Sequence, residues 1–444
     1  MAHEAKLANI GFLEVAGEAS AFGTEGTNYE YVRTMPIDRG SVVPTTFRDE
    51  SQRQNDVELE KIIGAHNGSL SVSSYLHGFS SSTPSGAPTH IGSHHADSNG
   101  FDMILDILAG AIGNIHSGGH TTAEAGSTTS IIKANGTTLV NGQFIGWLDS
   151  SGNVHVNTVK SQDLGPNPDE FTLTQTATAV PASSTVFGAH TIFQATGSPF
   201  FEGTVSDTNP GGASTITTKG FSLRYTGMNA DDRDVYLGCW PSSLNIEMNV
   251  NELPMLNLEF LISHWRNDAL PTDLGIHSGV NSDNGGVGAS KAWSFPTCEA
   301  VTNAHISWGG SQANTRQVQG ISLDMGLEVS VIKDPNAKSG IGGYFIAKRT
   351  PKITATLMRD VSEEIHDFFG QDAKTLTVWA GSGFGKICAM QMGAARIDEY
   401  PTPSDVDGAL MTTVTWVANE YTSDGGDITS QALPGDKQFK LGFL

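Results

Sequence analysis

Alternation of apolar and polar residues with a period of two runs through this chain and predicts β-strands. In SLNIEMNV (243–250), Leu244, Ile246, Met248 and Val250 share one face of the strand. MLNLEFLI (255–262) repeats the pattern, and the intervening segment contains Pro254, so the two read as a hairpin. ISLDMGLEVSVI (321–332) is expected to be the longest strand. Further strands are predicted at 57–63, 69–76, 221–225, 235–239, 352–358, 375–380, 386–397 and 410–418.

Two segments carry helical spacing instead. Residues 101–112 place apolar side chains three and four apart, with Asn99 as a candidate cap. Residues 361–369 follow Ser362, a second candidate cap, and have Glu363 and Glu364 in the first turn. The chain is therefore predicted to be mainly β, with two flanking helices.

The order of predicted elements repeats along the chain: a strand, a helix and two strands, followed by the hairpin 243–262 in the early half and by the strand 410–418 in the late half. We expect a first β-barrel or sandwich domain from residues 1–120 and 201–270, a linker at 271–298, and a second such domain at 299–444. Residues 121–200 read as an inserted small all-β domain, which includes a hairpin at Asn135-Gly136 and a strand at 189–196.

Charge and cysteine usage exclude several classes of protein. Lys plus Arg is 25 and Asp plus Glu is 47, a net charge of −22, which argues against charge-driven binding of nucleic acid or anionic membrane. Cys239, Cys298 and Cys388 are far apart and favour a reducing compartment. The N-terminus lacks the apolar region of a secretory signal, and residues 101–112 are too short to span a bilayer, so we expect synthesis in a cytoplasm and no membrane association.

Enzyme signatures are weak. GSGFGK (381–386) has the wrong spacing for a phosphate-binding loop and reads as a hairpin turn, and neither GxSxG nor HExxH is present. Paired carboxylates for glycoside hydrolysis remain open, since their spacing is visible only in three dimensions. We expect no enzyme activity and no cofactor. Five histidines lie in loop-like, Gly-rich segments: His90, His94, His95, His116 and His120. We favour the interpretation that they face solvent, and metal binding by them stays open as the alternative.

The polar faces of the clearest predicted strands carry carboxylates and amides but neither Lys nor Arg. These residues are Glu58, Glu60, Asn245, Glu247, Asn249, Glu259, Asp324 and Glu328. An ordinary solvated sheet face usually mixes both signs of charge. A wall along which DNA slides would instead be kept negative, because like charges keep phosphates from binding to it.

Three stretches of the chain resemble the major tail tube proteins of long-tailed, siphovirus-like bacteriophages. They are EASAFGTEGTNYEYVRTMP (18–36) with the segment up to residue 112, DVYLGCWPSSLNIEMNVNELPMLNLEFLISHW (234–265), and the repeated order at 301–420. The resemblance implies a structural subunit whose strands join edge to edge into rings, which stack into a tube for ejection of double-stranded DNA. Because the chain carries two tube-like halves, three copies are expected to form a pseudo-six-fold ring.

The same resemblance implies locations and partners. The lumen is expected to be lined by Asn245, Glu247, Asn249, Glu259, Asp324 and Glu328. The polar loop 33–56 is the candidate contact between stacked rings, through Arg39, Arg48, Asp49, Glu50, Arg53 and Asp56. The insert is expected to face outward. Expected partners are further copies of the chain and the tail tip, tape measure and terminator proteins, with DNA passing transiently, in a virion tail assembled in the host cytoplasm.

Two other classes of function compete with this interpretation. A secreted or virion-surface adhesin or carbohydrate-binding protein would predict a signal sequence and often calcium loops. A capsid decoration protein or a tail terminator would not require long strands that polymerise. Self-assembly into hollow tubes separates these classes from a tail tube subunit.

Overall fold

The computed structural model describes the chain in segments. They are residues 11–18, 22–26, 30–32, 34–35, 37, 41–48, 61–76, 107–108, 110–116, 120–135, 139, 141–194, 220–227, 233–267, 300–301, 304–312, 318–337, 339–358, 363–370, 373–381, 386–406, 408–418 and 439–444.

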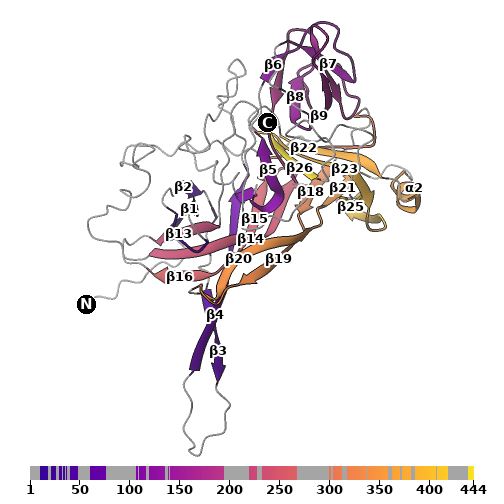
Figure 1. The fold of residues 1–444 in the computed structure, drawn as a ribbon. Helices are drawn as coiled ribbons and strands as arrows, with labels where there is room; N and C mark the ends of the chain where they lie inside the picture. The colour runs from indigo at the N-terminus through magenta and orange to yellow at the C-terminus, as the bar shows by residue number, and fades with distance from the viewer. Residues whose placement is uncertain are drawn as a thin grey trace, which may run out of the picture.

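The protein is mainly β, as the alternation predicts, and its strand pairing is antiparallel (Figure 1). The described strands form an 18-stranded sheet, a six-stranded sheet and a two-stranded sheet. Among the described helices, none is long and apolar enough to cross a membrane.

Strands of the 18-stranded sheet come from both ends of the chain. The earlier ones are β1 (Gly11–Gly17), β2 (Glu30–Val32), β3 (Ser41–Arg48), β4 (Lys61–Tyr75), β5 (Gly113–His116), β12 (His190–Gln194), β13 (Phe221–Gly227), β14 (Arg233–Asn249), β15 (Met255–Ile262) and β16 (His264–Asn267). The later ones are β17 (Ala304–Trp308), β18 (Val318–Asp324), β21 (Lys352–Met358), β22 (Lys374–Ala380), β23 (Cys388–Ile397), β24 (Thr402–Val406), β25 (Ala409–Ala418) and β26 (Phe439–Phe443).

Helical structure occurs where the spacing predicts it. Residues 107–108 and 110–112 are helical and lead directly into β5; residues 101–106 lie outside the described part of the chain. The second helix, α2, spans Glu363–Gly370, and the candidate cap Ser362 is likewise outside the described residues.

The order of strand pairing occurs twice. In the first half the strands pair in the order β1–β13–β14–β15–β4–β3. In the second half the order is β17–β22–β23–β25–β21–β18. Matching strands also follow one another in the same order along the chain, with a helix after β4 and after β21. This agreement supports an internal repeat.

The longest strand, β14, joins these two halves. Its first part pairs with β13 and β16, and its second part pairs with β15 and β18. The sequence predicted separate strands at 235–239 and 243–250, which is wrong: the chain continues as one strand of 17 residues. Gly238, with φ at +58°, takes a left-handed conformation within the strand without the cost of a Cβ.

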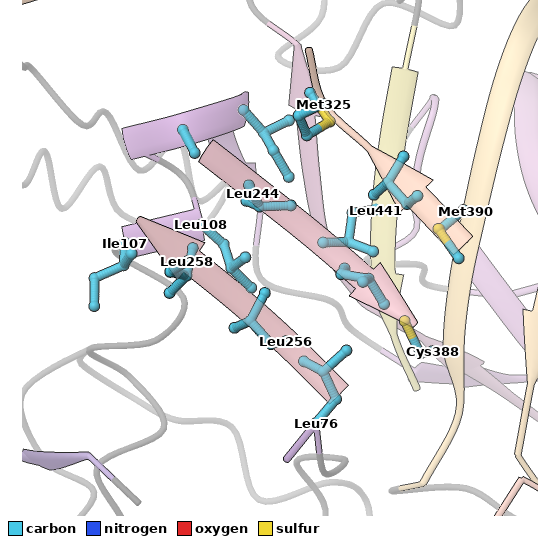
Figure 2. Close-up of a cluster of buried hydrophobic side chains, with 14 of the residues drawn as sticks. Leu76, Ile107, Leu108, Leu244, Leu256, Leu258, Met325, Cys388, Met390 and Leu441 are labelled. Atoms are coloured by element: carbon cyan, nitrogen blue, oxygen red, sulfur yellow. The ribbon is translucent and has the colours of Figure 1, made fainter. Parts of the chain in front are cut away.

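One hydrophobic core serves both halves. Leu108 of the first helix packs with Leu244 and Leu258 of β14 and β15, and the cluster extends to Met390 and Leu441 of the second half (Figure 2). Each such fully buried side chain contributes about 1.5–3 kcal/mol. The halves therefore share a core and a sheet, although the sequence expected two tandem domains; the predicted linker 271–298 lies outside the described residues.

The predicted long strand 321–332 is divided in two. β18 ends at Asp324, whose Oδ1 accepts a hydrogen bond from Gly326 N at 2.9 Å, and Gly326 turns with φ at +52°. The chain then enters β19 (Leu327–Lys333), which pairs with β20 (Ile341–Arg349) in a separate sheet. The alternation also fails there, since Val331 is 42% exposed.

The expected loop 33–56 contains a strand, β3, which pairs with β4 and projects with it from the body (Figure 1). Its run of Val42, Val43, Thr45, Thr46 and Phe47 is rich in β-branched and aromatic residues, which favour strands. β4 also joins residues 61–63 of the predicted strand 57–63 to the predicted strand 69–76, while residues 57–60 lie outside the described part of the chain.

The insert forms the six-stranded sheet, from β6 (His120–Thr122), β7 (Ile131–Ala134), β8 (Phe144–Leu148), β9 (Val154–Asp163), β10 (Asp169–Leu173) and β11 (Thr185–Gly188). Most of the hairpin predicted at Asn135-Gly136 lies outside the described residues; in the described part, β7 pairs with β10, and Leu139 is not in a strand. The predicted strand 189–196 corresponds to β12, which pairs with β5 and β26 in the large sheet.

The insert packs against the second half of the chain. Phe144 and Val156 of the insert share a buried cluster with Trp379 of β22 and Ala389 of β23. Hydrogen bonds cross the same contact: Gln312 Nε2 donates to Val156 O at 2.6 Å, and Thr158 Oγ1 donates to Gln391 Oε1 at 3.0 Å. Loss of the insert would uncover this apolar surface.

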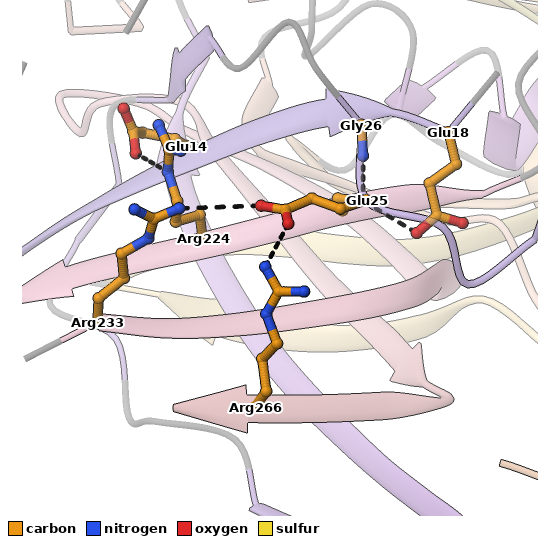
Figure 3. Close-up of polar contacts among 8 residues, drawn as sticks. Glu14, Glu18, Glu25, Gly26, Arg224, Arg233 and Arg266 are labelled. Atoms are coloured by element: carbon orange, nitrogen blue, oxygen red, sulfur yellow. Dashed lines mark hydrogen bonds and ion pairs between the residues drawn. The ribbon is translucent and has the colours of Figure 1, made fainter. Parts of the chain in front are cut away.

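A buried carboxylate supports the left-handed turn of β14. Glu18 accepts hydrogen bonds from Gly238 N and Gly23 N, both at 2.8 Å, and from Ser222 Oγ at 3.0 Å. It lies beside a group of ion pairs in which Glu14 bonds Arg224 and Glu25 contacts Arg233 and Arg266 (Figure 3). Burial is the largest influence on Glu18 and raises its pKa to about 7, against the effect of these hydrogen bonds.

We predict that Glu18 makes the free energy of unfolding depend on pH. Its folded pKa of about 7 exceeds the ordinary 4.5, so the folded state binds the proton more tightly. The protonated Glu18 stabilises the folded state fully below about pH 4.5, and this stabilisation is lost as the pH rises to about 7. The free energy of unfolding should fall by roughly 3 kcal/mol over this range. Urea unfolding of wild type and Glu18→Gln should show this loss in wild type only; equal pH dependence in both would contradict it.

Candidate functional site

Seven strands form a continuous sheet with one polar face. The order is β4–β15–β14–β18–β21–β25–β24, and we call this the seven-strand sheet. Alternate residues of neighbouring strands lie side by side on one side of it, which we call the polar face. It contains Ser71, Ser73, Ser243, Asn245, Glu247, Asn249, Asn257, Glu259, Ser322, Asp324, Lys352, Thr354, Thr356, Thr413 and Thr415.

Five of the six predicted lumen residues come together on the polar face. Asn245 lies opposite Asn257 on one side and Asp324 on the other. Glu247 lies opposite Ser322, and Glu259 lies opposite Ser243 and Ser71. Glu247, Asn249, Glu259 and Asp324 are exposed, whereas the alternate residues Leu244, Ile246 and Met248 are buried in the core.

Short polar side chains contact one another along and across the strands. Ser73 Oγ donates to Asn257 Oδ1 at 2.7 Å, and Asn245 Nδ2 donates to Ser243 Oγ at 3.2 Å. On β21 and β25, the hydroxyls of Thr354 and Thr415 lie 3.1 Å apart, and those of Thr356 and Thr413 lie 3.4 Å apart. The face is therefore a hydrophilic wall of short side chains.

Cations border the acidic strands of this surface. Lys352 lies opposite Asp324, and Arg396 of β23 lies opposite Val417, the β25 neighbour of Lys352. Lys352 Nζ donates to Asp398 Oδ2 at 2.6 Å, and this hydrogen bond is the main reason that the pKa of Lys352 is raised. The acidic part of the polar face is formed by β14, β15 and β18. The cations belong to β21 and β23, and the sequence analysis did not predict that these later strands lie near the acidic ones.

Glu328, the sixth predicted lumen residue, does not lie on the polar face. It belongs to β19, beyond the turn at Gly326, and its Oε1 accepts a hydrogen bond from Lys348 Nζ of β20 at 3.4 Å. Glu58 and Glu60, from the same sequence pattern, lie outside the described residues.

The predicted contact loop is described only in part. Arg48 is the last residue of β3, so it extends a strand and does not lie in an irregular loop. The other candidates are outside the described residues: Arg39, Asp49, Glu50, Arg53 and Asp56.

Metal and thiol chemistry find little support in the part of the chain that the structure describes. No group of three or more His, Cys, Asp or Glu side chains is placed there to hold a metal ion. His116 ends β5 and His120 begins β6, while His90, His94 and His95 are outside the described residues. Cys239 and Cys388 are buried free thiols, and burial raises the pKa of Cys388 to about 12.

Sequence reasoning missed an exposed apolar cluster at the end of α2. Phe368 and Phe369 contact Tyr400, with ring centroids 5.7 Å and 6.3 Å apart. Asp367, on the same helix, accepts hydrogen bonds from Trp308 Nε1 and Lys374 Nζ, both at 2.6 Å, which fixes the helix on the sheet. The consecutive Phe368 and Phe369 were the available signal, because one helix face cannot bury both.

Comparisons of the sequence with protein-family models and with curated proteins find no match.

Proposed function

We propose that this protein is the structural subunit of a bacteriophage tail tube, which polymerises into stacked rings around a conduit for double-stranded DNA. The observation that carries the proposal is the polar face: a broad, continuous sheet surface with an apolar core behind it and short hydrophilic side chains in front. Such a hydrophilic surface suits the wetted wall of a channel.

The charge of the polar face supports passage of DNA better than binding. Glu247, Glu259 and Asp324 repel phosphates, and Lys352 is paired with Asp398. The chain as a whole carries a net charge of −22. A protein that holds DNA instead clusters Lys and Arg against the backbone.

The repeated strand order supports a ring of three chains. The seven-strand sheet offers seven strands, so three chains supply about 21. Barrels of about 16–18 strands already leave a water-filled channel. A barrel of the larger size, with the polar face inward, leaves a wide lumen.

The remaining parts of the proposal follow from this arrangement. The insert packs on β22 and β23, on the apolar side of the seven-strand sheet, and would face outward. The projecting β3–β4 hairpin is available for contact between stacked rings. In this role the protein acts without catalysis in the virion tail, and its partners are further copies of itself and the tip, tape measure and terminator proteins.

Electron microscopy of the concentrated, purified protein in negative stain tests the proposal. We predict stacked rings with an open lumen. Discrete solid particles at all concentrations, with no tubes on addition of preformed tail tips, would contradict it and favour a decoration protein or an adhesin.

Charge reversal on the polar face tests whether it lines the lumen. Glu247→Lys with Glu259→Lys should leave stability within about 0.5 kcal/mol, since both side chains are exposed. Assembled tubes of this variant should retain double-stranded DNA at least about tenfold more strongly than wild-type tubes, with a steep loss as salt is raised.

The matched control is Glu328→Lys with Glu170→Lys, which makes the same charge change away from the polar face. Retention of DNA by the control variant equal to that of the first variant would show that the polar face does not line the lumen. DNA pelleted with the tubes measures both.

A further inference from the structure

A short segment after β1 lies where the two halves of the chain meet. It consists of residues 22–26, which we call the strap, and it follows Glu18. A Cβ on Gly26 would come within 2.7 Å of Ala16 Cβ and of Gly17 O, so the strap lies directly against the end of β1.

The carboxylate of Glu18 fastens the strap to β13 and β14. Gly26 N donates to Ser222 Oγ at 3.0 Å, and Ser222 Oγ donates to Glu18 Oε1 at 3.0 Å (Figure 3). Gly238 N donates to the same carboxylate oxygen at 2.8 Å, and Gly23 N donates to Oε2 at 2.8 Å. One side chain thus collects hydrogen bonds from the strap and from two strands.

A second carboxylate, Glu25, fastens the strap to β14 and β16. It forms ion pairs with Arg266 of β16 and with Arg233 of β14, the latter over 3.8 Å. These side chains are partly exposed, so the contact with Glu25 contributes less than the buried one with Glu18.

The strap also reaches the second half of the chain. Phe22 meets Tyr344 of β20 edge to face, with ring centroids 5.4 Å apart, and Tyr344 is buried. A Cβ on Gly238 would lie 2.8 Å from Phe22 Cζ, so the Phe22 ring rests on the left-handed turn of β14. The strap therefore contacts β14 on one side and β20 on the other.

The proton of Glu18 and the position of the strap depend on each other. Glu18 is fully buried, and burial raises its pKa to about 7 despite the hydrogen bonds that it accepts. Opening of the strap returns the carboxylate to water, where its ordinary pKa is 4.5. Loss of the proton therefore favours the open strap, because the charged form is better solvated there.

Other titratable groups surround the strap. Burial, with the nearby Glu18, raises the pKa of the Cys239 thiol on β14 well above its usual range, and burial likewise raises the pKa of Tyr344. The elements packed around the strap also carry Glu14, Glu25, Arg224, Arg233, Asp234, His264 and Arg266. Arginine stays charged at neutral pH, whereas histidine ordinarily titrates there, so a test has to separate Glu18 from His264.

We propose that the strap is a pH-dependent fastening between the two halves of the chain, which holds β14 against β20 while Glu18 is protonated and opens more readily once Glu18 is ionised. The proton passes to solvent, and no covalent bond changes. This behaviour is independent of the proposed function, since it requires a single chain only.

The expected size follows from the two pKa values of Glu18. Between pH 4.5 and 7 the equilibrium constant for opening should rise by about 300-fold, because the open form loses its proton at the lower pH. Above about pH 7 both forms are ionised, and the constant should stay level.

Hydrogen–deuterium exchange of the intact chain from pH 4.5 to 8.5, corrected for the chemical exchange rate, tests the proposal. Protection of the Gly23 and Gly26 amides should fall by about 300-fold up to pH 7 and then stay level. Glu18→Gln keeps the shape of the side chain but does not ionise, so it should show no such fall. An equal fall in this variant would assign the effect to His264 and overturn the proposal, as would no fall in wild type.

Urea separates opening of the strap from unfolding of the whole chain. Opening of five residues exposes little surface, so exchange at Gly23 and Gly26 should not depend on urea at low concentration. Exchange at these amides that accelerates with urea as steeply as at Val414 of the buried strand β25 would show global unfolding and contradict a local strap.

The contact between Phe22 and Tyr344 tests the link to the second half. In wild type, the Tyr344 amide on β20 should lose protection by at least about threefold over the same pH range. The Val43 amide, in the projecting β3–β4 hairpin, is the matched control and should not respond. Phe22→Ala should abolish the response at Tyr344; a response that persists in this variant would show that the strap does not act on β20.

Discussion

Backbone hydrogen bonding along β14 is the interaction on which the rest of the structure depends. This strand of 17 residues pairs with β13 and β16 in its first part and with β15 and β18 in its second. It therefore belongs to both halves of the chain. Because its side chains alternate between the two faces of the sheet, Leu244, Ile246 and Met248 are buried in the shared core. The polar face follows directly, because the residues between them have to point the other way.

The sequence predicted what local alternation controls. The face of β14 and β15, the hairpin between them and the helix α2 are present as expected. It did not predict how strands from distant parts of the chain pair. Lys352 lies opposite Asp324 because β21 pairs with β18. β12 belongs to the large sheet and not to the sheet of the insert, because it pairs with β5 and β26. Such contacts depend on topology, which a period of two does not encode.

Single backbone positions account for the other differences. Gly326 adopts a left-handed turn that separates β18 from β19, and this removes Glu328 from the polar face. Gly238 also has a left-handed conformation, but it does not end β14. Its N–H donates a hydrogen bond to Glu18, and the strand continues past it. Both glycines lie inside segments predicted as strands, so the sequence pattern alone does not distinguish a break from a bend.

If the repeat is the basis of assembly, each chain supplies two similar halves to a ring. Electron cryomicroscopy of the assembled particle tests this most directly. The account predicts three chains in each ring and the polar face toward the lumen. Six chains in each ring, or a polar face turned outward, would contradict it.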